Sequence, residues 1–294
     1  LTIASGTLDV SASNYGITVA GNFDNSDTFT ARSGTVTFDK SSGTQTLNTG
    51  SSSFYNLTHS GAGTLQLVTS ALTVTNNLTN SAGTLDANGL AINVAGTWDN
   101  TGGTYTANGN TFTLTGGDQS ILGSTTFYNL VKTVSSAATL TFEAATTQVV
   151  SGALTLQGAL NNLLSLVSSI ADTQFSINIP SSFTLNFLNV KDLNNTNATS
   201  RAVSNSKDSG NNTNITFTAT TVTWTGTTNT DWGTATNWDV GYVPNATDNI
   251  VIADVANDPV LDTARTVNNL TINSGGVLDV SASNYALSVT GNFT

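Results

Sequence analysis

The chain has 294 residues, of which 38% are hydrophobic and only 9% are charged, and its formal net charge is -11 at pH 7. Soluble domains usually carry about 25% charged residues, so the polar character of this chain comes from Thr, Ser, Asn and Gly. An acidic chain repels phosphate backbones, which argues against nucleic-acid binding. The absence of cysteine excludes disulfides and thiolate chemistry. No apolar run approaches the roughly 18 residues that a membrane span requires.

The chain opens with LTIASGTLDVSASNYGITVAGNF at Leu1 to Phe23, and this segment returns as LTINSGGVLDVSASNYALSVTGNF at Leu270 to Phe293. With Gly276 treated as an insertion, 17 of the 23 aligned positions are identical. Such a match indicates one long period that begins at Leu1 and starts again at Leu270. The region 270–294 is therefore interpreted as the first coil of the next long period.

A shorter repeat divides the first half of the chain. The motif FYNL occurs at Phe54 to Leu57 and again at Phe127 to Leu130, and the flanks of the two copies also correspond. We therefore expect two repeat units, 1–77 and 78–150, each built from turns of about 20 to 30 residues. Their short alternating segments, separated by Gly, Asn and Ser, are typical of strands joined by tight corners.

Residues 151–220 are expected to form a diverged unit of the same kind. Apolar residues in Gly158 to Asp172 fall at helical spacing, but the surrounding strand pattern favours two apolar strands there. A polar stretch at 194–214 is expected to leave the surface as a loop.

Residues 221–269 form a distinct connector module that is rich in tryptophan. Two hypotheses apply to its aromatic residues: they fill or cap a junction, or they contact a glycan through exposed rings. The residues concerned are Trp224, Trp232, Trp238 and Tyr242.

These repeats predict an all-β fold, a parallel β-solenoid, preferably a right-handed β-helix. The alternative is an array of antiparallel β-sandwich domains. The solenoid is favoured because neighbouring turns resemble one another, as equivalent coils do. Its inward positions are expected to include Leu8, Val10, Ile17 and Val19. Equivalent asparagines, Asn25 with Asn100 and Asn56 with Asn129, are expected to form amide ladders.

Two segments also resemble a known class of repeat proteins. FYNLTHSGAGTLQL and WTGTTNTDWGTATNWDVGYVPNATDNIVI are similar to repeats of large bacterial secreted and cell-surface proteins, the haemagglutinin-like or adhesin-like right-handed β-helices. The resemblance implies an extracellular or cell-surface location and an adhesive or scaffolding role. It identifies no site residue.

Catalytic and cofactor-binding residues are not predicted. Asp9, Asp86 and Asp279 recur at one place in three copies of a motif, which is typical of corner residues rather than of a single active site. His59, the only histidine, corresponds to Lys132 in the next unit and is expected to be solvated. Glu143 is interpreted as a surface carboxylate.

Calcium is the only metal that the sequence suggests, and it does so weakly. The oxygen-rich segment KDSGNN at 207–212 and the series Asp254, Asp258 and Asp262 match no known calcium motif, so turn chemistry is preferred.

The predicted function is structural: a fibre, stalk or sheath on a bacterial surface, built by self-association of coil ends or by continuation into further repeats. The alternative is an adhesin that binds a glycan or host protein through the Trp-rich module or the 194–214 segment. A polysaccharide lyase or hydrolase is the least favoured hypothesis.

Overall fold

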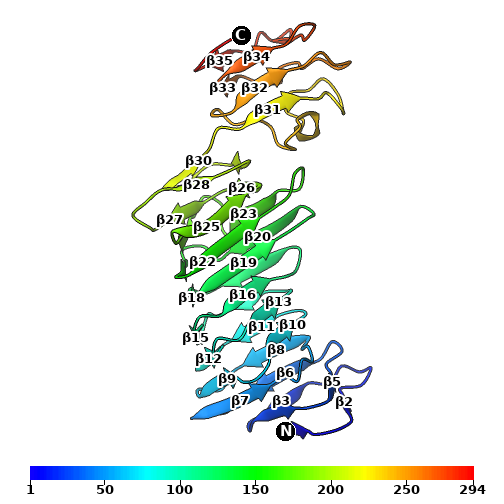
Figure 1. The fold of residues 1–294 in the computed structure, drawn as a ribbon, viewed down its shortest axis with the longest axis vertical. Coiled ribbons are helices and arrows are strands. Elements are labelled where there is room, and N and C mark those ends of the chain that lie inside the picture. Colours follow the sequence, from blue (N-terminus) through cyan, green and yellow to red (C-terminus); the bar gives the residue numbers. More distant parts are fainter.

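The computed structural model describes all 294 residues, and they form an all-β chain of stacked coils (Figure 1). The strands run across a long axis, with the amino terminus at one end and the carboxyl terminus at the other. Every pairing between strands is parallel, which confirms a parallel β-solenoid and excludes antiparallel sandwiches. The only helical turn is the 3-10 segment η1 (Ala235–Asn237). No helix is long and apolar enough to cross a membrane.

Through residue 217, the strands fall on three faces, and successive strands take these faces in turn except before β8 (Asn56–His59) and β30 (Ile215–Phe217), where the skipped face has only an isolated bridge. Face 1 holds β1 (Thr2–Ile3), β4 (Phe23–Asn25), β7 (Thr44–Asn48), β9 (Thr64–Leu67), β12 (Thr84–Asp86) and β15 (Thr104–Thr106), followed by β18 (Thr125–Phe127), β21 (Thr147–Val150), β24 (Phe175–Asn178) and β27 (Leu193–Asn195). Face 2 holds β2 (Thr7–Asp9), β5 (Thr28–Thr30), β10 (Leu72–Val74), β13 (Ile92–Val94), β16 (Thr111–Leu114), β19 (Asn129–Thr133), β22 (Ala153–Gln157), β25 (Ser182–Asn186), β28 (Arg201–Val203) and β30 (Ile215–Phe217). Face 3 holds β3 (Ile17–Val19), β6 (Thr35–Phe38), β8 (Asn56–His59), β11 (Leu78–Asn80), β14 (Trp98–Asp99), β17 (Gln119–Leu122), β20 (Ala138–Phe142), β23 (Leu164–Ser168), β26 (Leu188–Val190) and β29 (Lys207–Asp208).

The alternating sequence of each strand explains the core. Leu85 pairs with Leu65 in the coil before it and with Tyr105 in the coil after it, and all three side chains are buried. Neighbouring threonines point outward because successive side chains of a strand face opposite sides. Val10 and Val19 are buried as predicted, while Leu8 and Ile17 are partly buried against the same core.

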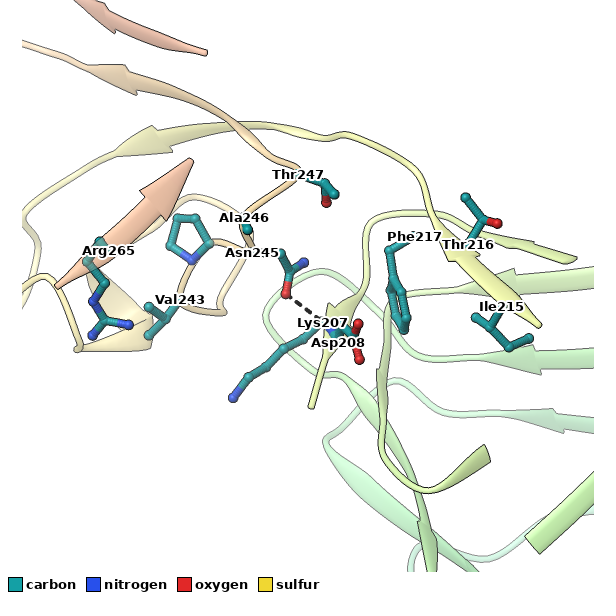
Figure 2. A pocket seen from close by; sticks show the side chains of 11 residues that line it. Lys207, Asp208, Ile215, Thr216, Phe217, Val243, Asn245, Ala246, Thr247 and Arg265 are labelled. Atoms are coloured by element: carbon teal, nitrogen blue, oxygen red, sulfur yellow. Dashed lines mark hydrogen bonds between the residues drawn. The ribbon is translucent and has the colours of Figure 1, made fainter. Parts of the chain in front are cut away.

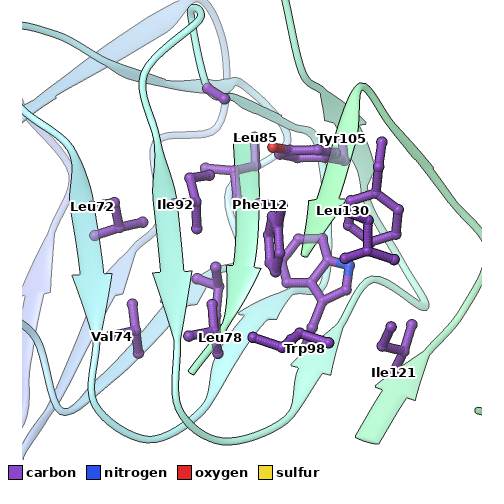
Figure 3. Packing of buried hydrophobic residues seen from close by; sticks show 14 of the residues in the cluster. Leu72, Val74, Leu78, Leu85, Ile92, Trp98, Tyr105, Phe112, Ile121 and Leu130 are labelled. Atoms are coloured by element: carbon purple, nitrogen blue, oxygen red, sulfur yellow. The ribbon is translucent and has the colours of Figure 1, made fainter. Parts of the chain in front are cut away.

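Each repeat unit places a cluster of aromatic rings inside the coils. In the second unit, Trp98, Tyr105 and Phe112 contact one another (Figure 3), and Phe127 contacts Tyr105 and Phe112; the ring centroids of these pairs lie 5.2 to 6.0 Å apart. The first unit has an equivalent cluster of Phe23, Phe29, Phe38 and Phe54. Tilted and edge-to-face contacts of this kind add stability beyond the area that they bury.

The second repeat unit is shifted by one face, to the preceding face, relative to the first. The segment of β2 returns in sequence as β12, but β2 lies on face 2 and β12 on face 1; likewise β6 lies on face 3 and its counterpart β16 on face 2. This happens because the second unit opens with β11, part-way through a coil, between β9 and β12 of face 1. The unit is therefore not a whole number of coils, and sequence-equivalent residues do not lie one above the other.

The expected asparagine ladders exist, but between other partners. Asn80 Nδ2 donates to Asn100 Oδ1 at 2.8 Å, and Asn76 Nδ2 donates to Asn56 Oδ1 at 2.9 Å. The pairing of Asn25 with Asn100 and of Asn56 with Asn129 was wrong, because the members of each pair lie on different faces.

Two local predictions have clear outcomes. Residues 158–172 contain no helix: a tight turn bridged by Ala159 and Asn162 leads into β23, which pairs with β20 and β26. The prediction of a projecting loop at 194–214 was wrong, because this stretch contributes β28 and β29 to the coils. Its asparagines donate to neighbouring coils, as Asn205 Nδ2 does to Asn186 Oδ1 at 2.9 Å.

The carboxyl-terminal part has its own core. Strands β31 (Thr221–Trp224), β32 (Asn249–Ile252) and β34 (Leu270–Ile272) form one sheet, and β33 (Arg265–Val267) pairs with β35 (Leu287–Val289). Eleven buried residues form this core, separate from the 43 buried residues of the preceding coils. The solenoid therefore has two cores; the chain passes from one body to the other near residues 218–220, and Leu163 of the preceding coils packs against the smaller core.

Candidate functional site

The Trp-rich module is closed rather than open to ligands. Trp224, Trp232 and Trp238 are at most 1% exposed and Tyr242 is 2% exposed. Trp238 contacts both other indoles edge to face, with centroids 4.9 and 4.7 Å away. Their burial agrees with the hypothesis that these four rings fill a junction and speaks against glycan contact through them, because no ring face is exposed.

The indole N–H groups of Trp224 and Trp238 find acceptors inside the module. Trp224 Nε1 donates to the Asn257 carbonyl at 2.7 Å, and Trp238 Nε1 donates to the Trp232 carbonyl at 2.9 Å. The buried Asn237 Oδ1 accepts from the Thr228 amide at 2.9 Å, which fixes the segment that leads to η1. Buried indoles generally need such partners, so this module is built for packing.

The junction between the two bodies contains a cleft of about 700 Å³ (Figure 2). Asn245 bridges the junction: its Nδ2 donates to the Ser206 carbonyl at 2.9 Å, and its Oδ1 accepts from the Asp208 amide at 3.0 Å. The Asn245 side-chain amide thus makes the two hydrogen bonds to the edge of β29 that a backbone peptide group of a neighbouring strand would make. The cleft is lined by Lys207, Asp208, Ile215, Thr216, Phe217, Val243, Pro244, Asn245, Ala246, Thr247 and Arg265.

A buried carboxylate holds the linker beside this cleft. Asp248 accepts from the Thr220 amide at 3.1 Å and from the Asn245 amide at 2.8 Å. Burial raises the pKa of Asp248 above its ordinary value, and these hydrogen bonds oppose the shift. The linker therefore enters the second body at a fixed point.

The walls of the cleft combine charged and apolar groups. Lys207 forms no ion pair, whereas Arg265 makes a bidentate pair with Asp262 at 2.7 Å. Half-buried Ile215 and Phe217 provide apolar surface opposite Val243 and Pro244. Four of the eleven lining residues are hydrophobic, so this cleft is more polar than the usual small-ligand pocket. The sequence pointed to the two segments that supply most of this cleft, 194–214 and 221–269, but not to their meeting.

A second set of polar groups lies inside the first body. The expectation that His59 is solvated was wrong: His59 is fully buried, and its Nδ1 is hydrogen-bonded to Asn80 Oδ1 at 2.8 Å. Lys132, its counterpart, is also fully buried and donates from Nζ to the carbonyls of Gly116 and Gly117 and to Gln119 Oε1. Burial lowers the pKa of both groups, that of Lys132 to about 8. These groups line the inside of a closed coil and have no access to a ligand.

The recurring aspartates are corner residues, as predicted. Asp9, Asp86 and Asp279 each accept, through Oδ1, the backbone amide two residues later, at 2.9, 2.8 and 2.8 Å. This local turn is common for Asp. Glu143 Oε2 accepts the Gly123 amide at 2.7 Å and so also serves the backbone.

The calcium candidates do not come together. Asp208 Oδ1 accepts from the Gly210 amide and from Asn212 Nδ2, and Asp262 pairs with Arg265. No three His, Asp or Glu side chains gather as ligands of one ion. The hydrogen bonds of Asp208 stabilise the turn that follows it.

Comparison with known proteins gives one match. Residues 223–294, the carboxyl-terminal body, match a family model described as "Domain of unknown function (DUF8693)", which covers about a quarter of the chain. No curated protein and no solved structure matches the chain.

Proposed function

We propose that this chain is a structural repeat protein, a non-catalytic solenoid that builds an extracellular fibre, stalk or sheath on a bacterial surface. The extracellular and bacterial parts of the proposal rest on the sequence resemblance described above. The structural part rests on the fold, since coils that bond only to their neighbours can be repeated without changing the ones already present.

The observation that carries the proposal is the equivalence of the first coil and the last. The Asp24 amide donates to the Leu1 carbonyl at 2.9 Å, and the Thr294 amide donates to the Leu270 carbonyl at the same distance. The two coils also share left-handed backbone at matching corners, at Ser11 and Ser281 with φ of 66° and 63°. The coil that opens the long period is thus repeated in backbone geometry as well as in sequence, and this favours a structure built by recurrence.

Electron microscopy of the native material tests the proposal. We expect long fibres whose axial repeat equals the length of one period. Isolated particles of single-chain length in native material would contradict it.

A recombinant test asks whether periods can be joined. A chain of residues 1–269 followed directly by residues 1–294 is expected to form one straight rod of nearly twice the single length in negative stain. A matched control scrambles the residues of the second copy's 23–77 segment, and this control should show two rods joined by an irregular segment instead of one straight rod.

A second function is favoured by the junction cleft. An adhesin could hold a glycan or host-protein segment there, where the ring of Phe217 and the unpaired ammonium of Lys207 face one space. Glycan-array binding that is lost in Lys207→Gln and Phe217→Ala, but kept in the remote variant Lys40→Gln, would support it. Equal binding by all three variants would exclude the cleft.

A further inference from the structure

The last coil, residues 270–292, has an open strand edge. In the first coil, residues 1–22, which has nearly the same sequence, the equivalent edge is covered. Val10 of the first coil is 5% exposed, and its counterpart Val280 is 43% exposed. Phe23 is fully buried, and its counterpart Phe293 is 67% exposed. These residues differ in exposure because residues 23–48 lie over the first coil, whereas the 294 residues of this chain include no coil after the one that begins at Leu270.

The corner aspartates show what covers such a coil. Arg32, from the coil above, makes a bidentate ion pair with Asp9, with Nε to Oδ1 at 2.5 Å and Nη2 to Oδ2 at 2.6 Å. At the equivalent corner of the second unit, Asn108 Nδ2 donates to Asp86 Oδ1 at 2.8 Å. In both cases the donor belongs to the corner of the following coil.

The two donors share a backbone conformation. Arg32 and Asn108 are left-handed, with φ of 44° and 51°, at matching positions of TFTARSG and TYTANGN. Left-handed backbone is unfavourable for a side chain such as that of Arg. Its occurrence at both corners indicates that this geometry aims the donor at the aspartate below.

Asp279 has the same corner without the donor. Its Oδ1 accepts the Ser281 amide at 2.8 Å, as Asp9 accepts the Ser11 amide at 2.9 Å, and its side chain is exposed with no ion pair. Asn284 repeats Asn14, whose Oδ1 accepts the Ser33 amide of the covering coil at 3.0 Å. The last coil therefore offers a carboxylate and an amide oxygen in the arrangement that the first coil uses.

We propose that the open edge of the last coil binds a second copy of the coil formed by residues 23–48, and that the left-handed Arg or Asn of that coil donates to Asp279. This inference rests on the proposed function, a fibre built from repeated coils, and adds which residues of one coil recognise the next. The register is already fixed, since Phe293 pairs with Leu270 as the first strand of such a coil would.

The test uses the full chain extended after Thr294 by a copy of residues 25–77. We expect hydrogen exchange of the amides in β35 to slow by at least about tenfold relative to the unextended chain. An extension of scrambled sequence and equal composition is the matched control. Equal protection by the scrambled extension, or none by the native one, would overturn the proposal.

The ion pair is tested by reversing charges. Asp279→Arg in the extended chain is expected to reduce the protection by up to about fivefold, as removal of an exposed ion pair does, and Arg32→Glu in the extension's own copy is expected to restore it. Failure of restoration, with both variants otherwise folded as judged by circular dichroism, would overturn the role of Asp279. If the extension docks but native material forms no fibres, the proposed function fails and the proposed role of Asp279 stands. If native material forms fibres but the extension does not dock, the proposed function stands and the proposed role of Asp279 fails.

Discussion

Lys132 Nζ lies 2.7 Å from Gln119 Oε1 inside the solenoid, in the place that His59 and Gln45 occupy in the first unit. In that unit His59 Nε2 and Gln45 Oε1 are buried and have no hydrogen-bond partner. One unit therefore holds an ammonium with three acceptors, and the other holds an imidazole with one partner. The two units should respond differently to pH.

The buried ammonium of Lys132 should make stability rise with pH above neutrality. Burial lowers its pKa to about 8, and a nearby Asp118 opposes the shift. Between pH 8 and the unfolded value of about 10.5, the unfolded chain binds more protons than the folded chain, so the free energy of unfolding increases with pH. Urea unfolding at pH 7.0, 8.5 and 9.5 should show this increase in the wild type and a weaker one in Lys132→Met. An unchanged slope in Lys132→Met, relative to the control Lys40→Met, would contradict the assignment.

His59 should reduce stability in mild acid. Burial lowers its pKa, and the hydrogen bond to Asn80 opposes the shift. Below the unfolded pKa of about 6.5 the unfolded chain takes up a proton that the folded chain does not, so stability falls with pH by at most about 1.4 kcal/mol per unit. Comparing urea midpoints at pH 7.5 and 5.5 in wild type and His59→Asn isolates this contribution. The same loss in both proteins would assign it to carboxylates instead.

Two glycines at left-handed corners should differ in their tolerance of alanine. A Cβ at Gly83 would collide with the Gly63 carbonyl oxygen, whereas a Cβ at Gly109 meets nothing within 4 Å. Both substitutions incur the left-handed penalty of about 1–2 kcal/mol. Gly83→Ala must also displace the backbone of the coil below, so its melting temperature should fall clearly further than that of Gly109→Ala. Equal melting temperatures would show that the coil below can shift freely.

The two cores should unfold separately. Phe112→Ala removes a buried ring from the larger core and should cost that body about 3–5 kcal/mol. Trp238→Ala should destabilise only the carboxyl-terminal body, because its contacts lie within the smaller core. Calorimetry is expected to resolve two transitions, each shifted by one of the variants. A single transition that both variants shift equally would mean that the bodies are coupled.

Strand type and corner chemistry could be predicted because they depend on local pattern. Alternation such as that around Leu85 requires one inward face, and asparagine or glycine at a corner supplies the left-handed backbone. Asp9 and Asp279 were predicted as corner residues for the same reason. The parallel fold followed from the resemblance between neighbouring turns.

The length of a coil was predicted correctly, with offsets such as 20 residues from Thr64 to Thr84 and 26 from Ala138 to Leu164, but the partners of a residue in neighbouring coils could not be predicted from the repeat unit. The sequence period is not a whole number of coils, so the partners of Asn25 and Asn56 were misassigned. The burial of His59 was missed because an isolated polar residue in a strand gives no sign of a buried amide beside it. The junction cleft depends on residues as far apart as Lys207 and Arg265, which no local motif connects.

Because the second repeat unit is shifted by one face relative to the first, a partner that recognises the surface meets the two units on different sides of the rod. Tyr55 and Tyr128 belong to the same FYNL motif, yet they precede β8 on face 3 and β19 on face 2. The two copies of this motif therefore lie on different faces of the rod. A rigid multivalent ligand that lies straight along one side would meet only one of these two copies, and it would have to wrap around the axis to bind both.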